Sequence, residues 1–181
     1  MERSRTGIPL VGLALALGSI ACEELPTLPE PVSVEDTEFA PELGIDLDEM
    51  TRLESGVYVD DLVVGDGEGA MKGDSVTVHY KLWLHDGTLI HDTEATEDGV
   101  PAKFLLREGA IIGGWVDGVP GMRVGGTRKL VIPWQRAYGA QTVKDAQGVV
   151  VIPPYSNLVF EVELLDTVHL EDDGSSLPEP Q

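Results

Sequence analysis

The residues of this chain that could form a chemically defined site lie in residues 109–139. Ile111 and Ile112 form an apolar pair, Trp115 follows after two glycines, and Tyr138 stands near the end of the stretch. The stretch contains no nucleophile beside a base, no cluster of metal ligands and no phosphate-binding motif. An indole beside two isoleucines and a tyrosine describes an apolar pocket with one hydroxyl at its rim, which favours a binding site over acid–base chemistry.

Two other motifs could be mistaken for chemical sites. His79, His85 and His91 lie within thirteen residues, but in an extended strand His79 and His85 would be about 20 Å apart, at about 3.3 Å per residue. That separation is too long for one metal ion. The run GDGEG at residues 65–69 has no helix expected after it, so it predicts a turn rather than a dinucleotide-binding loop. We therefore expect neither a metal nor a cofactor.

The apolar pattern predicts the elements that position these residues. Residues 75–84 alternate between apolar and polar types, which predicts a half-buried strand. Trp115, Val119 and Met122 recur at helical spacing, which predicts a short helix over residues 116–122. Further strands are expected at residues 57–64, 89–93, 102–106, 127–133 and 157–165, with a tight turn at 136–139 and a long loop at 140–149. Five to six antiparallel strands and one helix that covers the sheet predict an α+β fold.

The ordered set of motifs resembles the FKBP-type peptidyl-prolyl cis-trans isomerases. The resemblance covers residues 55–168 and rests on the order of the motifs rather than on any one of them. The residues that carry it are VHY at 78–80, DG at 86–87, IIGGW at 111–115, Gly118, Met122, Val124, Gly125, Pro133, AYG at 137–139, IPP at 152–154 and LVFEVELL at 158–165.

The resemblance implies an FKBP-like fold, in which a curved antiparallel sheet wraps around one short helix and the active cleft lies between them. It implies that Trp115 forms the pocket floor, and that the Ile112 amide and the Tyr138 hydroxyl each hold a substrate carbonyl. The catalytic set that we expect is Tyr80, His91, Ile112, Trp115 and Tyr138, and the substrate-binding set is Ile90, Asp92, Ile111, Ile152 and Phe160. The implied activity is isomerisation of Xaa-Pro bonds in proline-containing polypeptides, without a cofactor, and the family's macrolide inhibitors are possible ligands.

The chain departs from the family pattern at three places. After the Asp-Gly turn, Ile90 and His91 stand where an aromatic residue and an aspartate are usual, with Asp92 one place further on. Ala102 stands two residues before Phe104, where a second pocket aromatic is usual, and the loop after residue 139 is longer than in short members. We therefore expect a wider, less aromatic pocket. These departures leave open an alternative function, a module that binds proline-containing segments with little turnover.

Charge excludes some partners. The 181 residues carry a formal net charge of −20, with ten carboxylates and no Lys or Arg between residues 23 and 50. Nucleic-acid binding needs clustered basic residues, and docking on anionic lipid needs them too. We therefore expect no nucleic-acid partner and no membrane contact through protein charge. The single cysteine, Cys22, excludes an intrachain disulfide.

The beginning of the chain indicates export. Arg3 and Arg5 precede fourteen uncharged residues, 8–21, which are too few for a relaxed membrane span but typical of a signal peptide. The end of this run, SIAC, resembles a bacterial lipobox, although Ser19 stands where an aliphatic residue is usual; Cys22 would then carry the lipid anchor. The expected division is a signal peptide (1–22), an acidic Pro-rich extended linker (23–54), the isomerase domain (55–168) and an acidic disordered tail (169–181). We expect a membrane-anchored lipoprotein that faces the periplasm or the cell surface.

Overall fold

A computed structural model describes residues 29–96 and 98–170 of the chain. The expected signal peptide, Cys22, the start of the linker and residues 171–181 of the expected tail lie outside these residues. Within the described ranges, no helix has both the length and the hydropathy that crossing a membrane requires.

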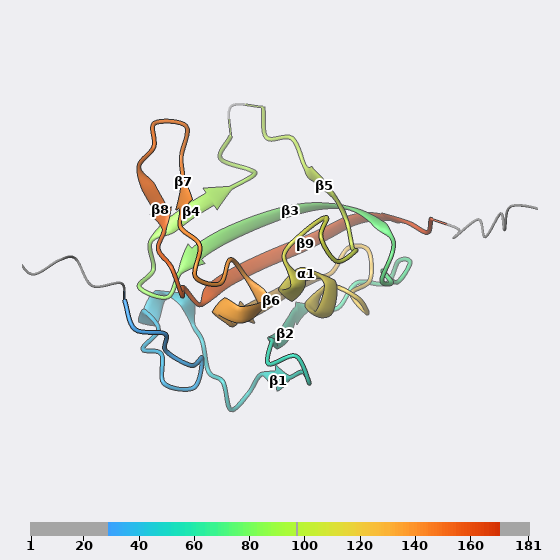
Figure 1. The fold of residues 1–181 in the computed structure, drawn as a ribbon. Helices are drawn as coiled ribbons and strands as arrows, with labels where there is room; N and C mark the ends of the chain where they lie inside the picture. Colours follow the sequence, from blue (N-terminus) through green and yellow to red (C-terminus); the bar gives the residue numbers. More distant parts are fainter. Residues whose placement is uncertain (1–28, 97, 171–181) are drawn as a thin grey trace, which may run out of the picture.

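An antiparallel sheet forms most of the molecule (Figure 1). Its main path runs β1-β2-β6-β9-β3-β4, and β5 also pairs with β3. The two longest strands, β3 and β9, lie side by side at its centre. The bounds of the sheet strands are β1 (Thr51–Arg52), β2 (Tyr58–Val63), β3 (Ser75–Leu84), β4 (Leu89–Asp92), β5 (Ala102–Leu105), β6 (Thr127–Ile132) and β9 (Leu158–Val168). The remaining elements are α1 (Gly113–Gly118), the 3-10 helices η1 (Pro41–Leu43) and η2 (Trp134–Arg136), and the hairpin of β7 (Val143–Lys144) and β8 (Val150–Ile152).

The helix α1 packs on one face of this sheet, which confirms the α+β fold. Alternate residues of β3, β6 and β9 point toward the helix and form the principal core with it. Trp115, Val119 and Met122 are all buried in this core, as their spacing predicted. The largest fully buried side chains of the core include Trp115, Leu106, Leu130, Ile132, Ile152, Leu158 and Leu164.

The sheet has seven strands rather than five to six, and the elements near the site differ from the sequence expectation in two places. The helix spans Gly113–Gly118 rather than residues 116–122, because it begins directly after its N-terminal cap, Ile112, and ends before its C-terminal cap, Val119. The expected long loop at 140–149 contains β7 and pairs with β8 as a hairpin, which projects beyond the sheet beside β4 (Figure 1). Val143 pairs with Ile152 across this hairpin, and such pairing is not visible in a short polar stretch of sequence.

The opposite face of the sheet is covered by the segment that we expected to be an extended linker. Val34 and Leu43 are only 2% and 5% exposed, and they form a second core with Tyr58, Val131 and Val159. The prediction of an extended linker is therefore wrong for residues 29–54. The acidic residues dominate the composition of this segment, but its few apolar residues meet a sheet face that is also apolar, and that burial holds it in place.

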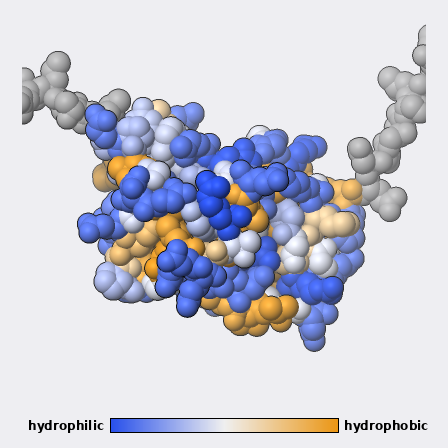
Figure 2. Space-filling view, turned by 90° about the horizontal axis from the view of Figure 1, so that it is seen from below, coloured by the Kyte–Doolittle hydropathy of each residue, from blue (hydrophilic) through white to orange (hydrophobic). Residues whose placement is uncertain are grey.

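The surface is mostly hydrophilic. Figure 2, seen from below relative to Figure 1, shows hydrophobic residues in several separate patches among hydrophilic ones. Scattered exposed apolar residues are normal for a folded protein, so this face offers no extended apolar surface.

Candidate functional site

A cavity of about 290 Å³ lies between the sheet and α1. Five separate parts of the chain contribute to it: β3, β5, β9, the segment that runs from residue 110 into α1, and the turn after η2. Its lining residues are Tyr80, Leu82, Phe104, Ala110, Ile111, Ile112, Trp115, Tyr138 and Phe160. Almost all of these side chains are apolar or aromatic, so a bound group would leave water for an environment of low polarity.

Trp115 forms the floor of the cavity. Its side chain is 1% exposed, and three other rings meet it edge to face. The centroid distances from its ring are 5.4 Å to Tyr80, 5.1 Å to Phe104 and 5.6 Å to Phe160. Aromatic rings prefer this edge-to-face geometry, so each contact restrains the indole. These contacts restrain Trp115, which is also one of the residues that line the cavity.

Ile111 and Ile112 form the wall where the chain enters α1. Residue 111 bridges to Glu108, which closes the preceding turn. The carbonyl of Ile112 accepts a hydrogen bond from the N–H of Trp115 at 3.0 Å and so begins the helix. The backbone of Ile112 therefore lies at the cavity wall and at the helix N-terminus, where backbone N–H groups point outward from the helix.

Tyr138 lines the cavity from the turn that follows η2. The turn that carries it is closed by two backbone hydrogen bonds, from the N–H of Gly139 to the carbonyl of Trp134 at 2.9 Å and from the N–H of Tyr155 to the carbonyl of Gly139 at 2.8 Å. Burial raises the pKa of the Tyr138 hydroxyl. Burial also raises the pKa of the Tyr80 hydroxyl, and the charge of an ionised Tyr138 would raise it further. Both hydroxyls therefore stay protonated and can donate hydrogen bonds at neutral pH.

The register of β4 decides how its three candidate residues point. Leu82 pairs with His91, but the next residue of β3, Trp83, pairs with Leu89, so Ile90 is an extra residue in a β-bulge. The bulge brings the His91 ring within 5.1 Å of the Tyr80 ring, although His91 remains exposed and is not part of the cavity wall. Ile90 packs against the principal core.

Two expected substrate-binding residues lie away from the cavity surface. The Asp92 carboxylate faces Lys81, with the Nζ atom 3.9 Å from Oδ2, and accepts the N–H of Glu94 at 3.0 Å. It therefore points to the other side of the sheet. Ile152 is 2% exposed and supports the cavity from within the core rather than lining it. The remaining predicted residues, Tyr80, Ile111, Ile112, Trp115, Tyr138 and Phe160, are brought together around one cavity.

Three residues of the cavity wall were not among the expected site residues: Leu82, Phe104 and Ala110. Phe104 pairs with Val76, and Ala102 pairs with Val78, so both point to the cavity side of β5. Phe104 therefore supplies an aromatic wall close to the place where we expected Ala102 to leave a gap. Whether the pocket is less aromatic than in other family members stays a prediction. The alternation of residues 102–106 could have shown that Phe104 shares a face with Ala102.

Among the residues that the structure describes, no group of three or more His, Cys, Asp or Glu side chains could hold a metal ion. The cavity itself is lined by no carboxylate, imidazole or thiol. Its chemistry is therefore limited to enclosing an apolar group and donating hydrogen bonds from a phenol hydroxyl or the backbone.

Comparisons with known proteins agree with this geometry. The family model described as FKBP-type peptidyl-prolyl cis-trans isomerase matches residues 67–165. The chain is 44% identical over 110 residues to an FK506-binding protein of Neisseria meningitidis serogroup B; the match covers 61% of this chain and 94% of that protein. It is 45% identical over 105 residues to FK506-binding protein 2 of Yarrowia lipolytica, covering 58% of this chain and 66% of that protein.

Solved structures show the same fold. The crystal structure of AtFKBP13 is similar with a TM-score of 0.58 and 34% identity, covering 66% of this chain and 99% of that one. The structure of FkpA from Escherichia coli is similar with a TM-score of 0.57 and 35% identity, covering 70% of this chain but only 55% of that one.

Proposed function

This chain belongs to the FKBP-type peptidyl-prolyl cis-trans isomerase family, and from that premise we propose that its cavity binds and isomerises Xaa-Pro bonds in exported polypeptides. The observation that carries the proposal is the enclosure of Trp115 by three aromatic rings at the floor of an apolar cavity. A prolyl ring is apolar and compact enough to rest on such a floor. An apolar residue before the proline would contact the wall that Ile111 and Phe104 form.

The mechanism needs no proton transfer. Resonance in the Xaa-Pro amide resists rotation with a barrier of about 18–20 kcal/mol. The twisted amide has lost this resonance and is less dipolar than the planar one, so an apolar cavity disfavours the planar form relative to the twisted form. The Tyr138 hydroxyl and the Ile112 N–H would hold substrate carbonyls on either side while the bond turns. Because burial raises the pKa of Tyr138, its hydroxyl remains a donor at neutral pH.

The first test is isomerisation of a Leu-Pro peptide by the purified protein. Tyr138→Phe removes one hydroxyl from the cavity, and we expect kcat/KM to fall about fivefold, since an uncharged hydrogen bond contributes about 1 kcal/mol. Trp115→Phe should lower kcat/KM further, because the smaller ring leaves less apolar surface at the floor of the cavity. Tyr155→Phe is the matched control, because Tyr155 lies outside the cavity. A folded protein that binds the peptide without accelerating isomerisation would overturn catalysis in favour of a binding module.

We also propose that the cavity accepts macrolide inhibitors. The relatives at 44–45% identity are named FK506-binding proteins, and the cavity here is apolar with a hydroxyl at its rim. Such a macrolide should compete with the peptide, so the apparent KM should rise with inhibitor while kcat stays constant. Inhibition that lowers kcat alone would place the inhibitor elsewhere.

Export and lipid anchoring form a separate proposal. It is supported by the two early arginines, the uncharged run at residues 8–21 and the single Cys22 at its end. Mass spectrometry of the protein expressed in a bacterium tests it directly. A chain that starts at Cys22 and carries a lipid-sized mass increment is expected. A chain that starts after a cleaved signal without lipid would contradict the anchor, and one that keeps residues 1–21 would contradict export as well.

A further inference from the structure

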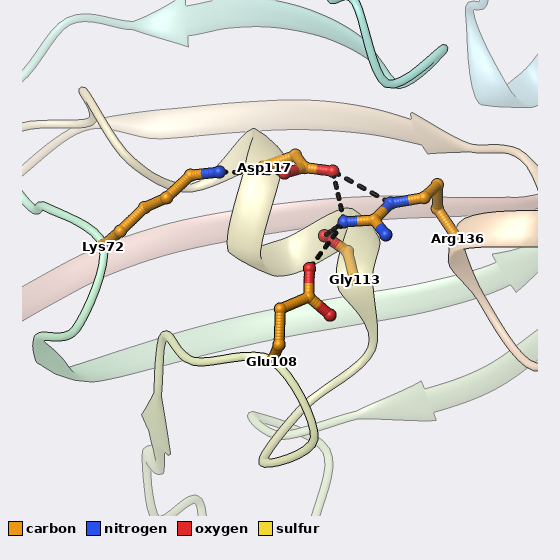
Figure 3. A network of polar contacts seen from close by, with 5 residues as sticks. All are labelled: Lys72, Glu108, Gly113, Asp117 and Arg136. Atoms are coloured by element: carbon orange, nitrogen blue, oxygen red, sulfur yellow. Dashed lines mark hydrogen bonds and ion pairs between the residues drawn. The ribbon is translucent and has the colours of Figure 1, made fainter.

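The Arg136 guanidinium joins several segments of the chain through polar contacts (Figure 3). Its Nε and Nη2 atoms both donate to Oδ2 of Asp117, at 2.9 and 2.6 Å. Nη2 also donates to Oε1 of Glu108 at 2.8 Å and to the carbonyl of Gly113 at 3.2 Å. On its other side, Asp117 accepts from Nζ of Lys72 at 3.0 Å. One side chain thus contacts a carboxylate on each of two segments and a carbonyl at the start of α1.

Each segment that Arg136 contacts carries part of the cavity wall. Asp117 and Gly113 belong to α1, which holds Trp115. Glu108 bridges to residue 111, so its position is tied to the apolar pair. Arg136 itself ends η2, two residues before Tyr138. The guanidinium therefore connects the turn that carries the hydroxyl with two other segments that form the cavity wall, although Arg136 does not line the cavity.

The surroundings favour a tight, oriented contact. Asp117 is 14% exposed, and although burial alone raises the pKa of its carboxyl, hydrogen bonds from Lys72 and Arg136 outweigh burial and leave that pKa below its ordinary value. The carboxylate is thus charged over the whole neutral range. A Cβ added at Gly113 would lie 2.5 Å from Cζ of Arg136, so the absence of a side chain there allows the guanidinium to lie against the helix start.

We infer that Arg136 is a positioning residue for the reaction: by bridging Asp117, Glu108 and Gly113, it fixes the distance between Tyr138 and the opposite wall of Ile112 and Trp115. This inference rests on the proposed role of Tyr138 as a donor to the substrate. The physical reason is that a substrate held by both the Tyr138 hydroxyl and the Ile112 N–H needs these two donors at a fixed separation. Small displacements of a positioned group reduce catalysis strongly. An arginine suits this role, because its planar fork fixes direction as well as distance.

A double-mutant cycle separates positioning from general stabilisation. Arg136→Ala should lower kcat/KM about fivefold in the otherwise unchanged protein, because misplacing the Tyr138 hydroxyl can cost no more than removing it. In the Tyr138→Phe background the same substitution should change kcat/KM less than about twofold, since the hydroxyl that it positions is already gone. If Arg136 only stabilised the fold, Arg136→Ala would lower kcat/KM by the same factor with and without the Tyr138 hydroxyl. Arg136→Lys should recover part of the loss, because an ammonium keeps the charge but not the fork.

A spectroscopic readout follows Tyr138 directly. Burial raises the pKa of its phenol, so a loosened turn in Arg136→Ala should shift the ultraviolet titration of this tyrosine toward about 10. The difference between proteins with and without Tyr138→Phe isolates this tyrosine from the others. Arg123→Ala is the control, because Arg123 makes one exposed hydrogen bond to Gly67 and contacts no cavity segment.

The outcomes are distinct. If Tyr138→Phe lowers kcat/KM and Arg136→Ala does so only in the presence of Tyr138, with the titration shifted, the inference holds. If Tyr138→Phe lowers kcat/KM but the two losses multiply, or Arg136→Ala behaves as Arg123→Ala, the positioning role is overturned while the proposed function stands. If Tyr138→Phe has no effect, the role of Tyr138 fails and the inference fails with it.

Discussion

At the scale of single residues, the site is a set of rings packed around Tyr80 and Trp115. Tyr80 meets the rings of His91, Phe104, Trp115 and Phe160 at centroid distances between 5.1 and 6.2 Å. Four of these rings, Tyr80, Phe104, Trp115 and Phe160, each contact at least two others of the set, so they cannot rotate freely and the cavity keeps its shape without a ligand. A rigid site of this kind binds with little loss of side-chain entropy.

Phe104 is the ring that tests this arrangement. Phe104→Ala removes a partly buried ring that contacts both Tyr80 and Trp115. We expect the free energy of unfolding to fall by about 2 kcal/mol, below the 3–5 kcal/mol typical of fully buried rings. Urea denaturation measures this loss, and kcat/KM should fall as the wall opens.

Leu89→Ala is the control for that substitution, since Leu89 is 51% exposed. Its effect on the free energy of unfolding should stay within about 0.5 kcal/mol. Equal effects of the two substitutions would show that the ring at 104 does not support the site.

At the scale of elements, the position of α1 is set by how closely it approaches β6. A Cβ added at Gly114 would clash with Cγ2 of Ile132, and one at Gly118 would lie 2.9 Å from Cδ2 of Leu130. Both partners are fully buried, so neither can retreat into solvent. The two glycines thus let the helix backbone lie against the strand, which places Trp115 at the right depth beneath the cavity.

Gly114→Ala tests this close approach. The added methyl group must displace α1 or Ile132, and we expect a loss of about 2 kcal/mol in the free energy of unfolding, as in other overpacked cores. Gly69→Ala is the matched control, because the nearest atom to its Cβ is the carbonyl oxygen of Met122 at 3.9 Å. That control should be neutral or slightly stabilising. A Gly114→Ala protein as stable as the control would mean that α1 has freedom to move.

At the scale of the whole molecule, the sheet is covered by α1 on one face and partly covered by the N-terminal segment on the other. Residues 29–54 lie outside the 67–165 range that the family model matches, yet they bury the second face. Asn157, 3% exposed, links this segment to the site: its Nδ2 donates to the carbonyl of Val32 at 3.0 Å and to Oγ1 of Thr37 at 2.8 Å, and its Oδ1 accepts from the N–H of Trp134 at 2.9 Å. The segment is therefore structurally part of the isomerase domain.

Deletion of residues 1–50 measures the contribution of this segment. The side chains of Val34 and Leu43 would no longer cover the sheet, and we expect the free energy of unfolding to fall by about 3 kcal/mol or more, at about 1.5–3 kcal/mol per buried aliphatic side chain. A chain that begins at residue 29 is the control and should unfold at the temperature of the full chain. Because every residue of the cavity wall follows residue 79, the folded fraction of the shorter chain should keep its activity. Equal unfolding temperatures for both chains would contradict the packing of the segment.

The end of β9 is fixed by a cluster that depends on pH. Nδ1 of His169 lies 2.8 Å from Oδ2 of the buried Asp74, and Nε2 lies 2.9 Å from Oε1 of Glu68. The hydrogen bond with Asp74 is the main cause of a raised pKa at His169. For Asp74, burial alone raises the pKa, but the hydrogen bond with His169 helps to leave it below its ordinary value.

This cluster should stabilise the protein at mildly acidic pH. Because the pKa of His169 is higher in the folded state, its contribution is complete below the unfolded value of about 6.5 and disappears as the pH rises through the folded value. The Asp74 contribution disappears instead as the pH falls through its lowered pKa. The difference in Tm between the unchanged protein and His169→Asn should therefore be largest between about pH 4 and 6.5 and shrink above that range. A difference that grows toward pH 9 would contradict this assignment.

The sequence alone determined the principal strands and most of the site. Alternation at residues 75–84 predicted β3 at its observed bounds, because one face of a strand is buried and the pattern records this locally. The ordered motifs identified the family and six residues of the cavity wall. These signals are local or carried by family pattern, so they do not depend on knowing which distant segments meet.

Only the tertiary structure decided the remaining features. The bulge at Ile90 turns His91 toward Tyr80 and Asp92 away from it. A shift of one residue in strand register moves each side chain to the other face of the sheet, although the sequence is unchanged. Arg136 meets Glu108 across 28 positions of sequence, and Val34 meets the sheet through a segment whose composition is typical of a linker. Pairing, register and burial arise from contacts between segments that are far apart in the chain, and no periodicity within a single segment encodes them.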